Sequence, residues 1–500
     1  MTSGLNDAYT ATLSRIRGQR GALARYGILA LMWISLAERP LLIDELCHAL
    51  AVEVEPPNID PEMVLPIETV VTSCMGLVTI DHASSTVRLV HATLGEYLCS
   101  QQDSVFQDPH ATIAEVCLSY LKIQSARELP PNLQTILREF PLLRYAFCHW
   151  GAHARKDLTV RVKQLVLGIL DHIEHVIPNT SPSSEENIWY WEPNSAGLSG
   201  LHYVAYFGIN EILETLLAMG QGDLNKGDKR GRTPLHLAAR RGNEEVVKTL
   251  LRCADVNPNA LDHMGDTPLH DASENNHEGV VRILLSHPNL NPNSVNRLGQ
   301  TPLVAACTWG HEGVVKILLS RADVNPNLAD GRGQKPLSLA ARDGYEGVVR
   351  ALLSRADSNP NSGTLFGPRP LYQASENGHE GVVKILLSCA DVHPSLTGDN
   401  GQAALSRAAE NGHGGVVKIL LSQADINPNL INWHGHTPLS LAAQNGHEGV
   451  VGILLSHADI NPNLANRHGQ TALSRAAENG HEGVVRILRS HIDANPDLGD

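Results

Sequence analysis

The C-terminal three fifths of the chain repeat one arrangement of apolar and polar positions. In each unit a short apolar segment is followed by a second one whose large side chains recur at helical spacing, as in Val314, Val315 and Leu318. A period of roughly 20 to 50 residues is typical of stacked-repeat proteins, so this pattern predicts nine copies of one helical unit. One glycine marks the constant interval of 34 residues: Gly197, Gly231, Gly265, Gly299, Gly333, Gly367, Gly401, Gly435 and Gly469.

The unit at 299–319 predicts two short helices. Thr301 is placed to cap the first helix, and Pro302 suits its first position, where an N–H has no partner in the helix. Gly310 ends that helix and opens the turn into the second one. Because a two-helix unit cannot bury its own apolar face, it must stack on its neighbours, and stability is expected to be a sum over adjacent interfaces.

The text of these units resembles the ankyrin repeat, as in Gly-Gln-Thr-Pro-Leu at 299–303 and Gly-His-Glu-Gly-Val-Val at 310–315. A tetratricopeptide repeat has a similar period, but its aromatic-rich helix pattern is absent and Thr-Pro-Leu is present. The units gain residues around Asn-Pro-Asn, as at 325–327, which we interpret as a longer loop leading into the hairpin finger. The resemblance covers all nine units.

The pattern upstream of the repeats predicts helices that are followed by a hairpin, an order typical of a winged helix. The helices are expected at 5–17, 22–37, 42–50 and 67–73, and the strands at 77–80 and 87–90. The proline-rich segment 55–61 is predicted to be a loop. Further helices are expected at 109–123, 133–155 and 158–177.

Several segments of this region look like the winged-helix segment of fungal NACHT-type STAND proteins, and a similar segment occurs in GPI inositol-deacylase-like proteins. They include Trp33-Ile34-Ser35, Glu45-Leu46-Cys47, Gly76-Leu77-Val78 and Arg88-Leu89-Val90-His91. In that family the segment follows the nucleotide-hydrolysing domain and transmits its state to the repeats. We expect that this chain starts too late to contain that domain. The text at 141–155 resembles the helical linker of the same proteins.

These patterns together predict a mainly α-helical protein of three parts. A small winged-helix-like domain spans 1–105, a helical linker spans 106–192, and an ankyrin-repeat solenoid of nine 34-residue units spans 193–500. Tyr203, Tyr206 and Phe207 are expected to cover the open N-terminal end of the solenoid, because the end of a repeat array needs a cap.

Charge and composition narrow the function. The formal net charge of −14 argues against a general nucleic-acid binder. Winged helices often bind DNA, but Arg88 is the sole basic residue between Arg39 and Lys122, whereas acidic residues are frequent there, so this surface would repel phosphates. The longest notable apolar run, 28–36, is about half of a membrane span, and no signal peptide is visible. The eight cysteines are expected to be buried free thiols, so we predict a soluble cytoplasmic protein without a membrane partner.

Catalytic motifs are absent from the sequence. It contains neither a phosphate-binding Gly-x-x-x-x-Gly-Lys-Ser/Thr loop nor a Gly-x-Ser-x-Gly elbow, so we predict no enzyme activity, cofactor or small-molecule substrate. His149 and His153 could share a helix face, but two ligands do not make a metal site, and no metal is predicted. Six histidines recur in the repeats and are expected to form hydrogen bonds between neighbouring turns: His277, His311, His379, His413, His447 and His481.

Two sets of positions vary between repeats while the framework stays nearly constant: the residues just before the recurring glycine, and the pair that ends the first helix. The ankyrin resemblance implies that they face the concave groove that holds partners. The large or charged residues there are the candidate partner-binding residues: Arg230, Arg240, Arg241, Met264, Trp309, Arg342, Phe366, Trp433 and His434. We expect Trp309, Phe366 and Trp433 to be anchors, because aromatic residues often dominate interface energies.

The leading hypothesis is a non-enzymatic scaffold for protein–protein interaction, or the ligand-sensing array of an intracellular STAND-type signalling receptor. Its partner would be another protein. The alternative is a regulatory fragment of a NACHT NTPase whose catalytic domain is missing from this chain, and a transcriptional regulator is the third possibility.

Overall fold

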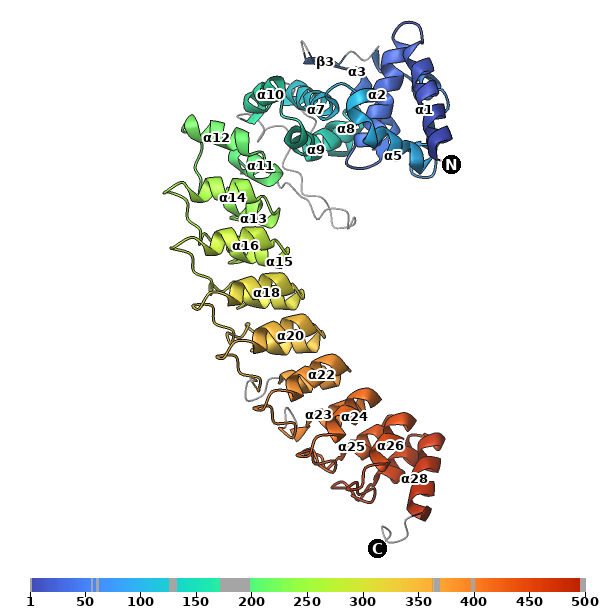
Figure 1. Ribbon diagram of the computed structural model, residues 1–500, viewed down its shortest axis with the longest axis vertical. Helices are drawn as coiled ribbons and strands as arrows, with labels where there is room; N and C mark the ends of the chain where they lie inside the picture. Colours follow the sequence, from blue (N-terminus) through green and yellow to red (C-terminus); the bar gives the residue numbers. More distant parts are fainter. Residues whose placement is uncertain are drawn as a thin grey trace. The chain divides into compact units, whose positions relative to one another are not determined.

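The computed structural model describes residues 2–54, 57–59, 63–125, 133–170, 198–361, 363, 369–396 and 401–494 (Figure 1). It is mainly helical, with 56% helix. The chain divides into two compact units, Met1–Val256 and Asn257–Asp500. None of the described helices combines the length and the apolar character that crossing a bilayer requires.

The first unit begins with the predicted helices and hairpin. Its helices are α1 (Thr2–Arg17), α2 (Leu23–Leu36), α3 (Ile43–Ala51) and α4 (Ile67–Ser73), and its strands are β1 (Leu41–Leu42), β4 (Val78–Asp81) and β5 (Thr86–Leu89). The antiparallel sheet has the order β1-β5-β4, with Val78 opposite Leu89. Leu31 and Trp33 of α2 are fully buried in the core beneath it. The predicted winged helix is confirmed.

The predicted loop at 55–61 is wrong in part, because Pro57–Ile59 forms strand β3. It pairs with β2 (Val52–Val54), and Val52 lies opposite Ile59. A strand of a two-stranded ribbon has a ladder partner on one side only, and proline is tolerated at such an edge.

A helical region follows the winged helix. Its helices are α5 (Ala92–Ser100), α6 (Gln102–Val105), α7 (Pro109–Ser125), α8 (Leu133–Glu139), α9 (Leu143–Lys156) and α10 (Val160–Leu170). The single helix predicted at 133–155 is wrong: Pro141 separates α8 from α9, because proline cannot donate the next helical hydrogen bond and restricts the residue before it. The predicted helix at 158–177 is present as α10, and residues 171–177 lie outside the described residues. Tyr120 of α7 and Tyr145 and Trp150 of α9 are fully buried between these helices.

Two repeats complete the first unit: α11 (Gly200–Phe207) with α12 (Asn210–Ala218), and α13 (Pro234–Arg240) with α14 (Glu244–Leu251). The aromatic residues of α11 lie against the helical region. Tyr203 makes an edge-on contact with Phe147 at 5.6 Å between ring centroids, and Phe207 makes one with Trp150 at 4.9 Å. Helix α9 thus covers the first repeat, and it packs on Tyr203 and Phe207 of α11.

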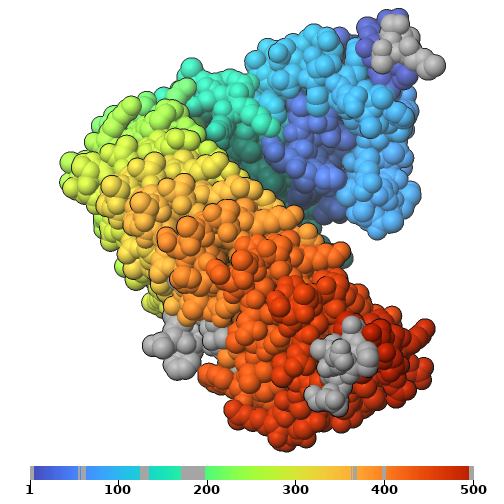
Figure 2. All heavy atoms as spheres, turned by 60° about the horizontal axis from the view of Figure 1, so that its bottom comes forward, coloured from blue at the N-terminus to red at the C-terminus, as the bar shows by residue number. Residues whose placement is uncertain are grey.

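The second unit consists of consecutive helix pairs. They are α15 (Pro268–Glu274) and α16 (Glu278–Leu285), α17 (Pro302–Thr308) and α18 (Glu312–Leu319), α19 (Pro336–Arg342) and α20 (Glu346–Leu353), α21 (Pro370–Glu376) and α22 (Glu380–Leu387), α23 (Ala404–Glu410) and α24 (Gly414–Leu421), α25 (Pro438–Gln444) and α26 (Glu448–Leu455), and α27 (Ala472–Glu478) and α28 (Glu482–Ala494). First helices pack on first helices and second helices on second helices (Figure 1). In space-filling form the successive repeats make a continuous surface (Figure 2). Gly197 and Gly367 of the glycine series lie outside the described residues.

The predicted roles within one unit are confirmed. The hydroxyl of Thr301 accepts a hydrogen bond from the N–H of Val304 at 3.2 Å. Gly310 has a φ of 73°, a conformation that favours glycine and ends the first helix. Val314 and Leu318 are fully buried. The helical stripe is therefore the surface on which the repeats stack.

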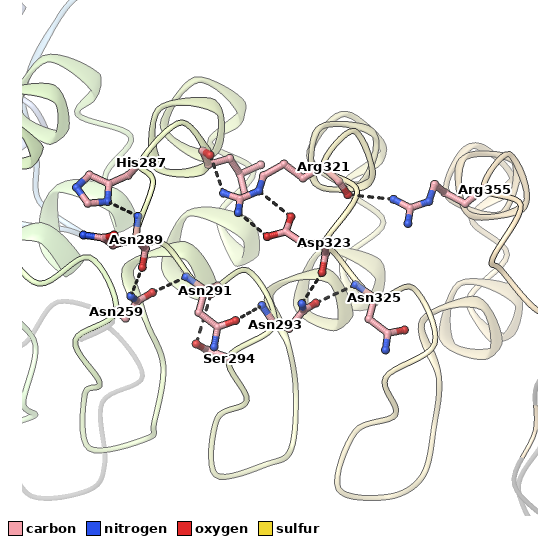
Figure 3. A network of polar contacts seen from close by, with 11 residues as sticks. Asn259, His287, Asn289, Asn291, Asn293, Ser294, Arg321, Asp323, Asn325 and Arg355 are labelled. Atoms are coloured by element: carbon pink, nitrogen blue, oxygen red, sulfur yellow. Dashed lines mark hydrogen bonds and ion pairs between the residues drawn. The ribbon is translucent and has the colours of Figure 1, made fainter.

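The Asn-Pro-Asn loops are joined by a ladder of side-chain hydrogen bonds (Figure 3). The carboxamide of Asn293 donates to the carbonyl of Asp323 at 2.6 Å and accepts from the N–H of Asn325 at 2.9 Å. Asn259 makes the same two bonds to Asn289 and Asn291, at the loop of the next repeat. The extra residues therefore connect neighbouring repeats, beyond lengthening the loop as the sequence predicted.

A second set of contacts lies behind this ladder. Arg321 donates to the carbonyl of Leu285 in the preceding repeat at 2.7 Å and pairs with Asp323 of its own loop at 2.5 Å (Figure 3). The eight cysteines are free, as predicted, but the prediction that they are buried is confirmed for only four of them: Cys47, Cys74, Cys117 and Cys307. Cys148, Cys253 and Cys389 are partly exposed, and Cys99 is exposed.

Candidate interaction surface

The fingers are tight turns held by one polar side chain each. Asp262 accepts hydrogen bonds from the N–H groups of Met264 at 2.8 Å and Asp266 at 2.9 Å. Asn432 accepts in the same way from His434 and His436. With the turn held internally, the residues at its tip point outward, and Met264 is 51% and Trp433 60% exposed.

Neighbouring fingers also contact each other. The N–H of Arg297 donates to the carbonyl of Met264 at 2.8 Å. The indole of Trp433 lies against Gly401 of the preceding finger, so closely that a Cβ at Gly401 would be 2.6 Å from the ring. Trp433 is thus both an exposed aromatic residue and part of the contact between two fingers.

The ends of the first helices carry the second set of candidates. Trp309 follows α17 directly and is 58% exposed, although Ala306 and Cys307 just before it are fully buried. Arg342 ends α19 and pairs with Asp343 at 2.8 Å. Arg240 and Arg241 end α13 in the first unit and are exposed.

The candidates are divided between the two units, and those of the second unit lie on several repeats. Arg230, Arg240 and Arg241 belong to the first unit, and Met264, Trp309, Arg342, Trp433 and His434 belong to the second. Within the second unit, Trp309 and Arg342 end first helices that pack on each other, whereas α19, α21 and α23 come between α17 and α25, whose finger carries Trp433. Phe366 lies outside the described residues.

The first helices of the later repeats carry an ionic cluster that the sequence did not predict. Arg407 of α23 bonds to Glu376 of the preceding repeat at 3.1 Å and to Glu410 at 2.9 Å, and its Nε donates to the hydroxyl of Tyr372. Glu376 and Glu410 occupy the variable column that ends the first helices. The signal was visible in the chain, because Tyr372 stands where His236 and His270 stand in earlier repeats.

The repeated histidines make the predicted bonds between turns. His311 Nε2 lies 2.9 Å from the carbonyl oxygen of Glu274 in the preceding repeat. The equivalent contact recurs at four further positions: His379, His413, His447 and His481. These side chains therefore have a structural role.

His149 and His153 of α9 do not converge on a common ligand position. His153 is fully buried, and its Nδ1 lies 2.9 Å from Nδ1 of His110 while its Nε2 lies 2.9 Å from the hydroxyl of Tyr145. That hydroxyl accepts from the N–H of Glu38, so it can donate to His153, whose Nδ1–H then donates to His110 with both rings neutral. Burial, with a smaller effect of His110, lowers the pKa of His153 to about 3.

Comparisons with known proteins agree with this architecture. A family model described as ankyrin repeats (3 copies) matches residues 201–296, 288–364, 356–432 and 424–500. A model of the GPI inositol-deacylase winged helix domain matches residues 10–108. No curated protein matches the chain.

Among solved structures, the chain is similar to the ankyrin repeat domain of Bcl-3, described as a unique member of the IkappaB protein family. The two are 26% identical, the match covers 45% of this chain and 99% of the Bcl-3 chain, and the TM-score is 0.41. The ankyrin matches extend from residue 201 to residue 500, more than half of the sequence. The chain belongs to the ankyrin-repeat family.

Proposed function

We propose that this chain is a non-enzymatic scaffold that binds another protein through its fingers and the ends of its first helices. One observation carries the proposal: Trp309 is 58% exposed at the end of α17, two residues after the fully buried Cys307. The repeat's own packing does not need a large aromatic side chain there, because the equivalent position is polar in the other repeats after the first, as at Asn275 and Asp343. In the first repeat this position is Phe207, which packs on Trp150 of α9. Exposed tryptophans commonly serve as interface anchors.

The proposed surface has two parts in the second unit. Trp309 and Arg342 form one part, and Trp433 and His434 form the other, with Met264 on an earlier finger. Phe366 belongs to the proposal by its sequence position alone. In the first unit, Arg230, Arg240 and Arg241 would add salt-dependent attraction to an acidic partner.

We further propose that residues 1–105 and 106–192 act as an adaptor for the array at 193–500, in a cytoplasmic STAND-type receptor. The match to a winged helix at 10–108, followed along the chain by the ankyrin matches from 201 onward, supports this arrangement. The net charge of −14 supports a protein partner over a nucleic acid. The alternative proposal is the regulatory fragment of a NACHT NTPase, supported by the same winged-helix resemblance.

The test uses the double variant Trp309→Ala, Trp433→Ala in the full chain. A partner is captured from the source cell, identified and titrated against both proteins. We expect a loss of about 2 kcal/mol or more, some thirtyfold in affinity, with unchanged helix content. Lys316→Ala is the matched control, because Lys316 is exposed on the second helix of the Trp309 repeat and pairs with Glu312. Equal affinity of the double variant and the control would refute the proposed surface.

A further inference from the structure

A cleft of about 800 Å³ lies in the first unit between α9 and the first two repeats. Five of its lining residues are cationic and one is a carboxylate, although the whole chain carries a net charge of −14. The cations are Arg39, Arg144, Arg155, Lys156 and Arg241, and the carboxylate is Glu38.

The walls of the cleft are joined by buried contacts. Asn243, which is 3% exposed, donates to the carbonyls of Ala205 and Tyr206, both at 2.8 Å, and accepts from Arg155 at 2.9 Å. Gly151 of α9 lies so close to Phe207 that a Cβ there would be 2.1 Å from the ring. Helix α9 and the first repeats therefore form a fixed site within the unit.

Two of the five cations form ion pairs with carboxylates of the first unit. Lys156 pairs with Glu38 at 2.8 Å, and Arg39 pairs with the buried Glu45 at 2.5 Å. Arg241 lies over the ring of Tyr206, with its guanidinium carbon 4.6 Å from the centroid, a contact that leaves its charge in place. Burial lowers the pKa of His149 in the cleft, and the nearby charge of Arg39 lowers it further, as a positive local potential would.

The spacing of the cations indicates the size of the ligand. Arg144 and Arg155 are both on α9, and at about 1.5 Å per residue their Cα atoms are roughly 16 Å apart along its axis. A row of cations of this length is longer than a single phosphate group, so one phosphate would use only part of it. An extended peptide, at about 3.3 Å per residue, covers that distance with roughly five residues. Guanidinium groups also match carboxylates geometrically, because each offers paired N–H donors.

We propose that this cleft binds an acidic peptide segment of a protein partner, whose carboxylates pair with Arg144, Arg155 and Arg241. The inference rests on the proposed scaffold function and names the partner's chemistry and a second contact site. The rim of the cleft offers Tyr206 for an apolar side chain of the same peptide.

The experiment measures fluorescence anisotropy of a labelled peptide of alternating glutamate and serine with the full-length protein. A peptide with glutamine in place of glutamate is the neutral probe. We expect saturable binding of the glutamate peptide, weakening as salt rises, and at least tenfold weaker binding to the double variant Arg144→Gln, Arg241→Gln. The single variant Arg241→Gln, an exposed position, should lose about threefold, and it tests the site even if the double variant folds poorly.

The double variant Arg282→Gln, Arg350→Gln removes the same charge from exposed helix positions of the second unit. It should bind the peptide as the parent does. Equal losses in both double variants would overturn the proposal, since they would show a response to net charge alone. Equal binding of the glutamine peptide, or competition by inorganic phosphate at the concentration of the peptide, would also overturn it.

An independent readout is the ring of His149, whose pKa should rise when the peptide is bound, because carboxylates reduce the positive potential around it. The outcome is distinguishable from failure of the scaffold function. If the cleft variants bind like the parent while Trp309→Ala with Trp433→Ala still weakens the captured partner, the cleft proposal fails and the scaffold function stands.

Discussion

The ladder between Asn-Pro-Asn loops leads to a prediction about the coupling of adjacent repeats. Replacing Asn293 with Ala removes two hydrogen bonds to the next repeat, one to the carbonyl of Asp323 and one from the N–H of Asn325. A hydrogen bond contributes roughly 0.5 to 1.5 kcal/mol net, and exposed bonds lie at the low end because water replaces them. We expect Asn293→Ala to weaken this interface by about 1 kcal/mol.

The assay is amide hydrogen exchange, since an array of repeats opens locally and one global unfolding transition would average over many interfaces. The N–H of Asn325 should exchange about fivefold faster in Asn293→Ala, the factor that corresponds to about 1 kcal/mol. The N–H of Asn359, which bonds to Asn327 in the next step of the ladder, should change little. Asn327→Ala should reverse this pattern, which makes the two variants matched controls.

The chain also contains a natural comparison. Ser395 occupies the ladder position of its unit and bonds to the carbonyl of Asp425 through its short hydroxyl at 3.0 Å. Ser395→Asn is therefore expected to stabilise that interface and to slow exchange in the loop that follows. If Asn293→Ala left the exchange of Asn325 unchanged, the ladder would have no energetic role and the reasoning would be refuted.

Two further outcomes are expected. The pKa of His153 is lowered to about 3, below its unfolded value of about 6.5, so the unfolded chain binds this proton more readily. The contribution of His153 to the free energy of unfolding is therefore complete above pH 6.5 and falls by up to about 1.4 kcal/mol per pH unit below it. Urea midpoints of the first unit between pH 7.5 and 5 measure this fall, and a midpoint independent of pH would contradict the buried neutral ring. Gly449→Ala should stabilise α26 by roughly 0.5 kcal/mol, because an added Cβ meets nothing within 4 Å. Gly381→Ala should give a smaller increase in stability, because the carboxylate of Glu346 would lie 1.7 Å from the added Cβ. Equal increases in melting temperature for the two variants would contradict this reasoning.

The helix pairs of the repeats were predictable because their signals are local. Thr301 and Pro302 start a helix and Gly310 ends it through interactions within a few residues. These signals recur every 34 residues, and because one repeat cannot bury Val314 and Leu318 by itself, the repeats must stack. The winged helix was predictable for the same reason, since turns and apolar runs mark its helices and hairpin.

Predictions failed where a nearby signal had two readings. Pro57 suggested a loop, but a two-stranded ribbon accepts proline at its edge. Pro141 was present in the sequence, yet the apolar pattern on both sides of it suggested one helix, and the break is visible only in the structure. At Pro57 the local pattern allowed either outcome, and pairing with β2 selected the strand. At Pro141 the local effect of proline on the backbone outweighed the apolar pattern.

The sequence by itself determined the single repeat: its period, its two helices, and the variable positions that Trp309 and Trp433 occupy. What only the tertiary structure decided was which distant groups meet. Arg39, Arg144 and Arg241 line one cleft although some 200 residues separate the first from the last, and the Asn293 carboxamide finds its partners in the next repeat, 30 and 32 positions away. Periodicity encodes how a segment folds on its own, whereas charge and hydrogen-bond geometry at a site depend on the positions of elements that the backbone brings together only after folding.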